Sequence, residues 1–197
     1  MCLSYFRQDL FNEQTFDASP EFEGVFELLL NARDFVNGSG SQKACTETEE
    51  KDLAEQLQHR LVANKQRLMN LPRHESYSRH VIGVHNEWVA YICRWEKGVT
   101  SCVHGHPWFA YYQVIDGVLD MDFYERCESP CSESSELEPV RMVQSRRMNP
   151  GDVVWRSGEP HQYDNLIHRV GTGNHPGFTL HLFSENPALG EHYRVAS

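Results

Sequence analysis

The sequence predicts a mainly β protein, a barrel preceded by a helical section within one domain of 197 residues. Before about residue 75, apolar side chains recur at the spacing of one helix face. From Tyr77 onward the chain consists of short apolar or alternating runs bounded by turn residues, which is typical of strands. We therefore expect a helical section at residues 1–75, packed on a barrel at residues 76–197, and a chain of this length can bury a substantial core.

Two helices are expected in the first section. Residues 19–21, Ser-Pro-Glu, predict the start of the first helix, with serine as the cap and proline in the first turn. Its apolar face contains Phe22, Val25, Phe26, Leu29 and Leu30. Residues 37–41, NGSGS, should form a loop. The second helix is expected from Thr46 or Thr48 to about Leu71, because TETEE is typical of a capping box. Its leucine stripe, at positions 53, 57, 61 and 68, should pack against the barrel.

The remaining chain predicts strands in sequence order. Residues 80–98 indicate two strands joined around His85-Asn86-Glu87, and residues 108–125 indicate a hairpin that turns at Asp116-Gly117. Residues 126–140 are polar and without periodicity, so we expect a long loop. Further strands are predicted in RMVQSRRMN, DVVWR and GFTLHLFSE, followed by a short tail.

Two separate segments propose a metal site. The first is GVTSCVHGH, Gly98 to His106, and the second is PGDVVWRSGEPHQYDN, Pro150 to Asn165. Alternate residues of a strand point to the same face, so His104 and His106 can share one ion. His161 would complete the site from a neighbouring strand. The spacings resemble the two short motifs of cupin barrels, which implies a double-stranded β-helix, or jelly roll.

The other histidines are expected to be solvated or structural by default, apart from His181. They include His59, His74, His80, His85, His168, His175 and His192.

The expected ligand set lacks a carboxylate. Cupins often carry a glutamate four or five residues after the second histidine, where this chain has Ala110 and Tyr111. Gly117 still occupies its expected position, so the motif's register holds. A neutral site with three imidazole ligands leaves room for substrate and dioxygen at Fe(II). Three histidines also suit a catalytic zinc, so the number of ligands does not choose the metal.

Composition excludes several classes of partner. Lysine plus arginine total 18 against 28 acidic residues, a net charge of −10, and no basic tract is present. We therefore expect no binding to nucleic acid or to an anionic membrane. The amino terminus lacks the apolar core of a signal peptide, and no run of eighteen apolar residues occurs, so a cytoplasmic protein is the default expectation. The six scattered cysteines are expected to be free thiols, with Cys127 and Cys131 in a surface loop.

Several segments together resemble the cysteine dioxygenase family, the mononuclear iron thiol dioxygenases of the cupin class. Tyr77-Ser78-Arg79 resembles the family's YTR, and Leu180-His181-Leu182-Phe183-Ser184 resembles its LHLYS. Trp95 lies nine residues before His104, and Ser101 lies three before it. With the HxH motif and His161, the resemblance spans about Tyr77 to Pro187.

The resemblance implies iron(II) as cofactor and assigns roles to further residues. In the family, iron(II) binds the substrate thiolate and dioxygen, and both oxygen atoms go to sulfur, which gives a sulfinic acid. Arg79 occupies the position that grips the substrate carboxylate, through two charge-assisted hydrogen bonds. Tyr77, Trp95 and Phe183 would line the substrate site. The thiolate would supply the negative charge that a protein carboxylate otherwise provides.

The chain departs from the family at its Ser-His-Tyr relay. Thr179, His181 and Phe183 alternate on one strand, and Thr179 can still hold the imidazole tautomer. Phe183 cannot donate a proton or a hydrogen bond. Either activity is slower, another phenol such as Tyr112 or Tyr163 takes over, or the reaction differs. With Ala110 and Phe183, the cysteine–tyrosine cross-link of some members cannot form.

The sequence therefore predicts an iron(II) thiol dioxygenase that acts on a small carboxylate-bearing thiol, with cysteine the first candidate and 3-mercaptopropionate the second. One alternative is a three-histidine cupin dioxygenase that oxidises a carbon substrate, and another is a catalytically silent metal-binding sensor. The expected partners are a small thiol and O2, and the expected assembly is a monomer or a small homo-oligomer.

Overall fold

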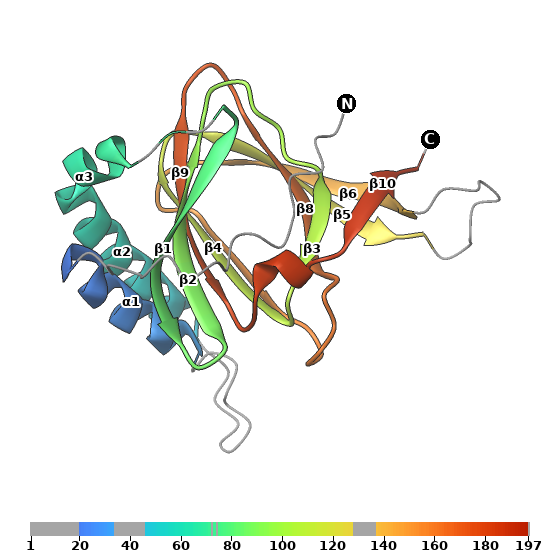
Figure 1. Ribbon diagram of the computed structural model, residues 1–197. Coiled ribbons are helices and arrows are strands. Elements are labelled where there is room, and N and C mark those ends of the chain that lie inside the picture. Colours follow the sequence, from blue (N-terminus) through green and yellow to red (C-terminus); the bar gives the residue numbers. More distant parts are fainter. Residues whose placement is uncertain (1–19, 34–45, 72, 74, 128–136, 197) are drawn as a thin grey trace.

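Two β-sheets face each other in the computed structural model (Figure 1). The structure describes residues 20–33, 46–71, 73, 75–127 and 137–196. The first sheet has the strand order β1-β2-β9-β4-β7. The second, β10-β3-β8-β5-β6, closes into a ring because β10 pairs with β3 and also, in parallel, with β6. The strands are β1 Tyr77–His85, β2 Trp88–Trp95, β3 Val103–His106, β4 Phe109–Asp116, β5 Leu119–Arg126, β6 Glu138–Met148, β7 Val153–Ser157, β8 Asn165–Thr172, β9 Gly177–Phe183 and β10 His192–Val195.

The connections between the sheets identify the architecture. From β2 to β5 the chain changes sheet at every step, and it does so again from β6 to β10. Two mainly antiparallel sheets traversed in this way form a jelly roll, the fold of cupins. The predicted fold class, a cupin-type barrel with an N-terminal helical section, is confirmed.

The helices cover the outer face of the first sheet (Figure 1). They are α1 Pro20–Arg33, α2 Glu47–Ala63 and α3 Lys65–Asn70, and a short 3-10 helix follows later at Pro187–Leu189. Thr46 and Glu49 form the expected capping box. The predicted single helix to Leu71 is wrong, because it breaks at Asn64, whose side-chain amide donates to the Arg60 carbonyl at 3.0 Å.

The helix layer explains why the strands of the first sheet are apolar on both faces. Along β4, Phe109, Tyr111 and Ile115 pack in the core shared with the helices. The intervening Ala110 and Tyr112 pack in a second core between the sheets. A strand covered on both sides must bury consecutive residues. The division into residues 1–75 and 76–197 stays a prediction, although the helices and the first sheet contribute to one core.

Turn chemistry was predicted correctly at one connection and incorrectly at another. β1 and β2 form a hairpin in which His85 pairs with Trp88, and Asn86 has a φ of 54°. The turn at Asp116-Gly117 joins β4 to β5, but these strands belong to different sheets, so the predicted hairpin is wrong. Gly117 has a φ of 82°, and a Cβ there would lie 2.6 Å from the Pro176 carbonyl oxygen.

Several expectations concern segments at the limits of the described chain. The loop at residues 37–41 lies outside the described residues, as do Cys2, Cys45, Cys131 and most of the predicted 126–140 loop. Cys93, Cys102 and Cys127 form no disulfide among the residues that the structure describes. No helix in the described ranges is long and apolar enough to cross a membrane.

Candidate metal centre

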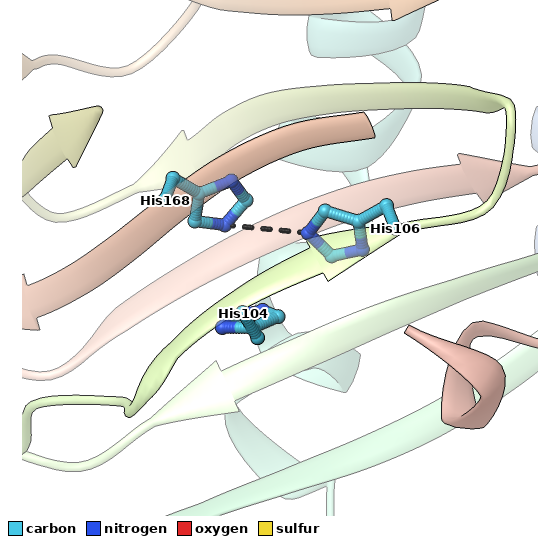
Figure 2. Close-up of side chains that lie close together, drawn as sticks. All are labelled: His104, His106 and His168. Carbon is cyan, nitrogen blue, oxygen red and sulfur yellow. Dashed lines mark hydrogen bonds between the residues drawn. The ribbon is translucent and has the colours of Figure 1, made fainter. Parts of the chain in front are cut away.

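Three histidines converge between the sheets, and their rings are turned toward one another (Figure 2). His104 and His106 project from one face of β3, as their spacing predicted, and His168 projects from β8. One ring nitrogen from each lies within 4.8 Å of the others. His104 pairs directly with His168 across the two strands. The cluster therefore has the composition and spacing of a metal site.

The structure places His168, and not His161, beside His104 and His106. The side chain of His161 is 85% exposed, on a turn where its φ is 64°, and its Nδ1 lies 4.0 Å from a Glu185 carboxylate oxygen. His168 is 1% exposed. Asn165, the end of the second motif, has a structural role, because its amide lies within hydrogen-bond distance of the Pro107, Trp108 and Arg156 carbonyl oxygens.

Backbone carbonyls set the tautomers of two ligands. His104 Nδ1 lies 3.0 Å from the Cys102 carbonyl oxygen, and His168 Nδ1 lies 2.9 Å from that of Leu166. A carbonyl can only accept a hydrogen bond, so each Nδ1 carries the proton and each Nε2 keeps a lone pair. His106 Nε2 lies 3.5 Å from His168 Nε2 (Figure 2). This arrangement is the usual support of metal-binding imidazoles.

A β-bulge places His168 at the centre. Between the pairs His104–His168 and His106–Asn165, β8 contains one residue more than β3. Leu166, within this bulge, has a φ of 50°, which is rare for a bulky residue. Bulges re-aim side chains next to functional sites. Here the bulge turns the Leu166 carbonyl toward His168 Nδ1 and fixes the imidazole.

Burial keeps the histidines neutral. It lowers the pKa of His104 to about 4, and it lowers the pKa values of His106 and His168 well below the usual range, with smaller contributions from neighbouring histidines and, for His104 and His106, from Arg79. Neutral imidazoles are the form that binds metal, so the site is competent at neutral pH. In the described part of the chain no carboxylate lines the surrounding cavity, in agreement with Ala110 and Tyr111 in the glutamate positions.

The donor set fits a transition metal. The carbonyl contacts leave His104 Nε2 and His168 Nε2 unprotonated, and the buried Nδ1 of His106 has no hydrogen-bond partner among the described residues. Imidazole ligands suit iron, zinc, copper and nickel. Two or three further ligand positions would remain on a five- or six-coordinate ion.

Gly105 is required between the two β3 ligands. A Cβ at this position would lie 2.7 Å from the Tyr163 carbonyl oxygen and 2.9 Å from the Asp164 Cα. These contacts are with backbone, which cannot move aside as a flexible side chain can. The close approach of the two segments therefore excludes any residue larger than glycine at position 105.

The cavity beside the cluster contains the residues predicted to hold substrate. Its volume is about 20 Å³, enough for one water-sized group. Its walls are formed by Tyr77, Arg79, Tyr91, Cys93, Trp95, Ser101, His104, His106, Tyr112, His168, His181 and Phe183. Tyr91 and Cys93 were missed in the sequence, although they alternate with Trp95 on β2 and so share its face.

Arg79 brings a permanent positive charge into this cavity. Its guanidinium carbon lies 5.5 Å from the centre of the Tyr77 ring and 5.7 Å from that of Tyr91. One guanidinium nitrogen lies 3.4 Å from the Tyr77 hydroxyl. The Tyr77 ring in turn stacks on Trp95 at 5.0 Å. Aromatic faces thus hold the guanidinium, which carries donors suited to a carboxylate.

A hydrogen-bonded chain runs from Trp95 on β2 through Thr179 to His181 on β9, in the wall of the cavity. Trp95 Nε1 donates to Thr179 Oγ1 at 2.8 Å, and Thr179 Oγ1 lies 2.7 Å from His181 Nε2. Phe183 stacks on His106 with centroids 4.8 Å apart. His181 and Phe183 therefore face the cavity, and Thr179 supports His181 from behind, while the roles predicted for these residues remain proposals.

Comparisons with solved structures yield matches of low sequence identity. No protein-family model matches the chain, and no curated protein matches it significantly. A cupin superfamily protein from Desulfitobacterium hafniense has 11% identity over 58% of this chain and 83% of its own, with a TM-score of 0.41. The hydroquinone 1,2-dioxygenase PnpCD has 15% identity over 63% and 71%, with a TM-score of 0.44. An oxalate oxidase has 13% identity over 61% and 56%, with a TM-score of 0.43. The fold assignment rests on the strand order and not on these matches.

Proposed function

We propose that this protein is an iron(II)-dependent thiol dioxygenase that converts a small carboxylate-bearing thiol, cysteine or one like 3-mercaptopropionate, to its sulfinic acid with O2. The observation that supports this most is the placement of Arg79 in the same small cavity as three neutral histidines. The histidines offer no negative charge to a divalent metal, and the guanidinium adds a further positive charge. A ligand with both a thiolate and a carboxylate would balance these charges.

Different residues of the cavity would bind different parts of the substrate. The Arg79 fork, held between Tyr77 and Tyr91, would take the carboxylate through two hydrogen bonds. Tyr77, Arg79, Ser101 and His104 are partly exposed, so the substrate would enter on this side. A three-carbon thiol exceeds the present 20 Å³, so side chains must move when it binds. Phe183 and Trp95 would keep the remaining walls apolar and exclude water.

The reaction balances without a further reductant. Iron(II), when bound, would provide a common site for the thiolate and dioxygen and mediate electron transfer between them. Sulfur loses four electrons and O2 accepts four, two S–O bonds replace the O–O bond, and the thiol proton leaves sulfur for solvent or for a sulfinate oxygen. Hydrogen-bonded to Thr179, His181 would be held facing the substrate.

The strand register agrees with the family resemblance. Ala110 and Phe183 lie directly opposite each other on β4 and β9. The cysteine dioxygenase family, which the sequence resembles, has a cysteine near the position of Ala110 and a tyrosine at the position of Phe183. In some members a cross-link joins these two side chains. Directly opposed positions on adjacent strands bring two side chains close enough for such a link, which supports the alignment on which the proposal draws.

Oxygen uptake by anaerobically purified, iron(II)-loaded protein tests the proposal. We expect uptake with 3-mercaptopropionate or cysteine and a product heavier than the thiol by two oxygen atoms in mass spectrometry. If none of cysteine, 3-mercaptopropionate and cysteamine is converted to a sulfinate, the proposed function is refuted.

The variant Arg79→Ala tests the carboxylate anchor, because the substrate panel supplies its own control. Loss of two charge-assisted hydrogen bonds should raise the KM for 3-mercaptopropionate at least about 30-fold. Cysteamine, which lacks a carboxylate, should be affected less than about threefold. An equal effect on both thiols would show that Arg79 acts structurally.

Phe183 favours a second candidate, a metal-binding module without turnover. Phe183 lacks the hydroxyl that the tyrosine of the Ser-His-Tyr relay provides in the cysteine dioxygenase family. Such a module would bind metal and a carboxylate-bearing thiol without oxygen consumption, which the same uptake experiment detects.

A further inference from the structure

A phenol whose hydroxyl forms no hydrogen bond of acceptable geometry within the described chain lies in the wall of the metal cavity. Tyr112 is 1% exposed, and its hydroxyl makes no hydrogen bond of acceptable geometry among the described residues, although the Thr179 side chain lies close to it. It lies on β4 directly opposite His181. Its ring meets that of His181 edge to face, with centroids 4.4 Å apart, and it meets His168 in the same manner at 5.8 Å.

Three other hydroxyls near the centre already have hydrogen-bond contacts. The Tyr77 hydroxyl faces Arg79, and the Ser101 hydroxyl donates to the Cys102 carbonyl. Thr179 Oγ1 accepts from Trp95. The other phenol considered from the sequence, Tyr163, donates to Glu185 at 2.7 Å and lies outside the cavity wall.

A buried hydroxyl without a hydrogen bond destabilises the folded state. When a native structure retains such a group, a functional role is one explanation. A phenol is protonated at neutral pH and can donate one hydrogen bond. Phe183, which stacks on His106, occupies the position where the resembling family has its phenol. Phe183 on β9 therefore provides no hydroxyl to the cavity, whereas Tyr112 on β4 provides one.

We propose that the Tyr112 hydroxyl donates a hydrogen bond to a small anionic ligand bound at the centre formed by His104, His106 and His168, and so replaces the hydroxyl that Phe183 lacks. The inference rests on the metal centre of the proposed function, but it does not depend on thiol oxidation. Tyr112 would be a specificity-determining residue for groups that accept a hydrogen bond beside the metal.

Azide binding to cobalt(II)-loaded protein tests this inference, because azide is a small anion that needs no turnover. Cobalt(II) reports added ligands through its visible absorption. We expect Tyr112→Phe to bind azide about tenfold more weakly than the wild type, the loss of one hydrogen bond to an anion, with unchanged cobalt affinity. The matched control Tyr163→Phe, which removes a phenol outside the cavity, should leave azide affinity unchanged.

Thermal unfolding of the metal-free proteins separates a ligand-binding role from a structural one. Tyr112→Phe removes a hydroxyl without a partner, so its midpoint should equal or exceed that of the wild type. Unchanged or tighter azide binding by Tyr112→Phe would overturn the inference, as would a wild-type cobalt protein that does not bind azide. If azide affinity falls as expected while no thiol is oxidised, the inference stands and the proposed function fails.

Discussion

Replacement of His168 by glutamine should abolish tight metal binding. His168 is one of three ligands, and its Nε2 lies 3.5 Å from that of His106. Glutamine retains a polar side chain of moderate size but offers no imidazole lone pair at this point. The matched variant is His161→Gln, because this histidine stands at the position that the second motif predicts, yet its side chain is 85% exposed.

The size of the effect follows from ligand number and linkage. Loss of a residue that only supports a ligand costs about 10–100-fold in metal affinity, so loss of a ligand itself should cost at least about 100-fold. At a metal concentration 100 times the wild-type Kd, binding stabilises the wild type by about 2.7 kcal/mol. The same concentration would equal the variant's Kd and stabilise it by about 0.4 kcal/mol.

Thermal unfolding with and without zinc(II) measures this difference. A domain of this size gains about 2–4 °C per kcal/mol, so we expect a metal-induced rise of about 5–11 °C for the wild type and below about 2 °C for His168→Gln. Each rise is measured from the same protein without metal, so a change in intrinsic stability does not enter. His161→Gln should show the wild-type rise. A full rise in His168→Gln, or its loss in His161→Gln, would refute the assigned ligand set.

Three further outcomes can be measured on the metal-free protein. Asn165→Ala should lower the free energy of unfolding by about 3 kcal/mol in urea titrations, because it leaves buried backbone carbonyls without a donor; a loss below about 0.5 kcal/mol would contradict this role. Gly105→Ala should lower the free energy of unfolding by about 1–3 kcal/mol, because the new Cβ would lie 2.7 Å from a backbone oxygen. The control Gly173→Ala should leave the free energy of unfolding nearly unchanged, because nothing lies within 4 Å of its Cβ. Burial lowers the pKa of His104 from 6.5 to about 4, so the unfolded chain binds more protons between these values, and stability should fall as pH decreases from 6.5 toward 4. Each histidine whose pKa is lowered by folding adds a slope of about 1.4 kcal/mol per pH unit to the free energy of unfolding in this range. His168→Gln removes one such histidine, so its free energy of unfolding should fall less steeply with decreasing pH, by that amount.

The sequence alone determined the features that depend on neighbouring residues. His104 and His106 share a face because side chains alternate along any strand, whatever the strand pairs with. The Thr46–Glu49 capping box and the turn residues Asn86 and Gly117 were recognisable because their chemistry acts over two to four residues. The pattern of apolar residues was also sufficient to separate helices from strands, and the jelly roll was predicted from the resemblance of the two histidine motifs to those of cupin barrels.

The tertiary structure decided which distant residues meet. NLIHRVGT was not recognised as a strand, so His168 was left among the solvated or structural histidines, and His161 was chosen from motif spacing. His168 reaches the centre only through the register of β8 against β3 and the bulge at Leu166. The Asp116-Gly117 turn was recognised, but its use as a crossing between sheets depends on the pairing partners of β4 and β5. Backbone geometry acts between neighbours in the chain, whereas the third ligand and the cavity walls depend on strand pairings between segments far apart in sequence.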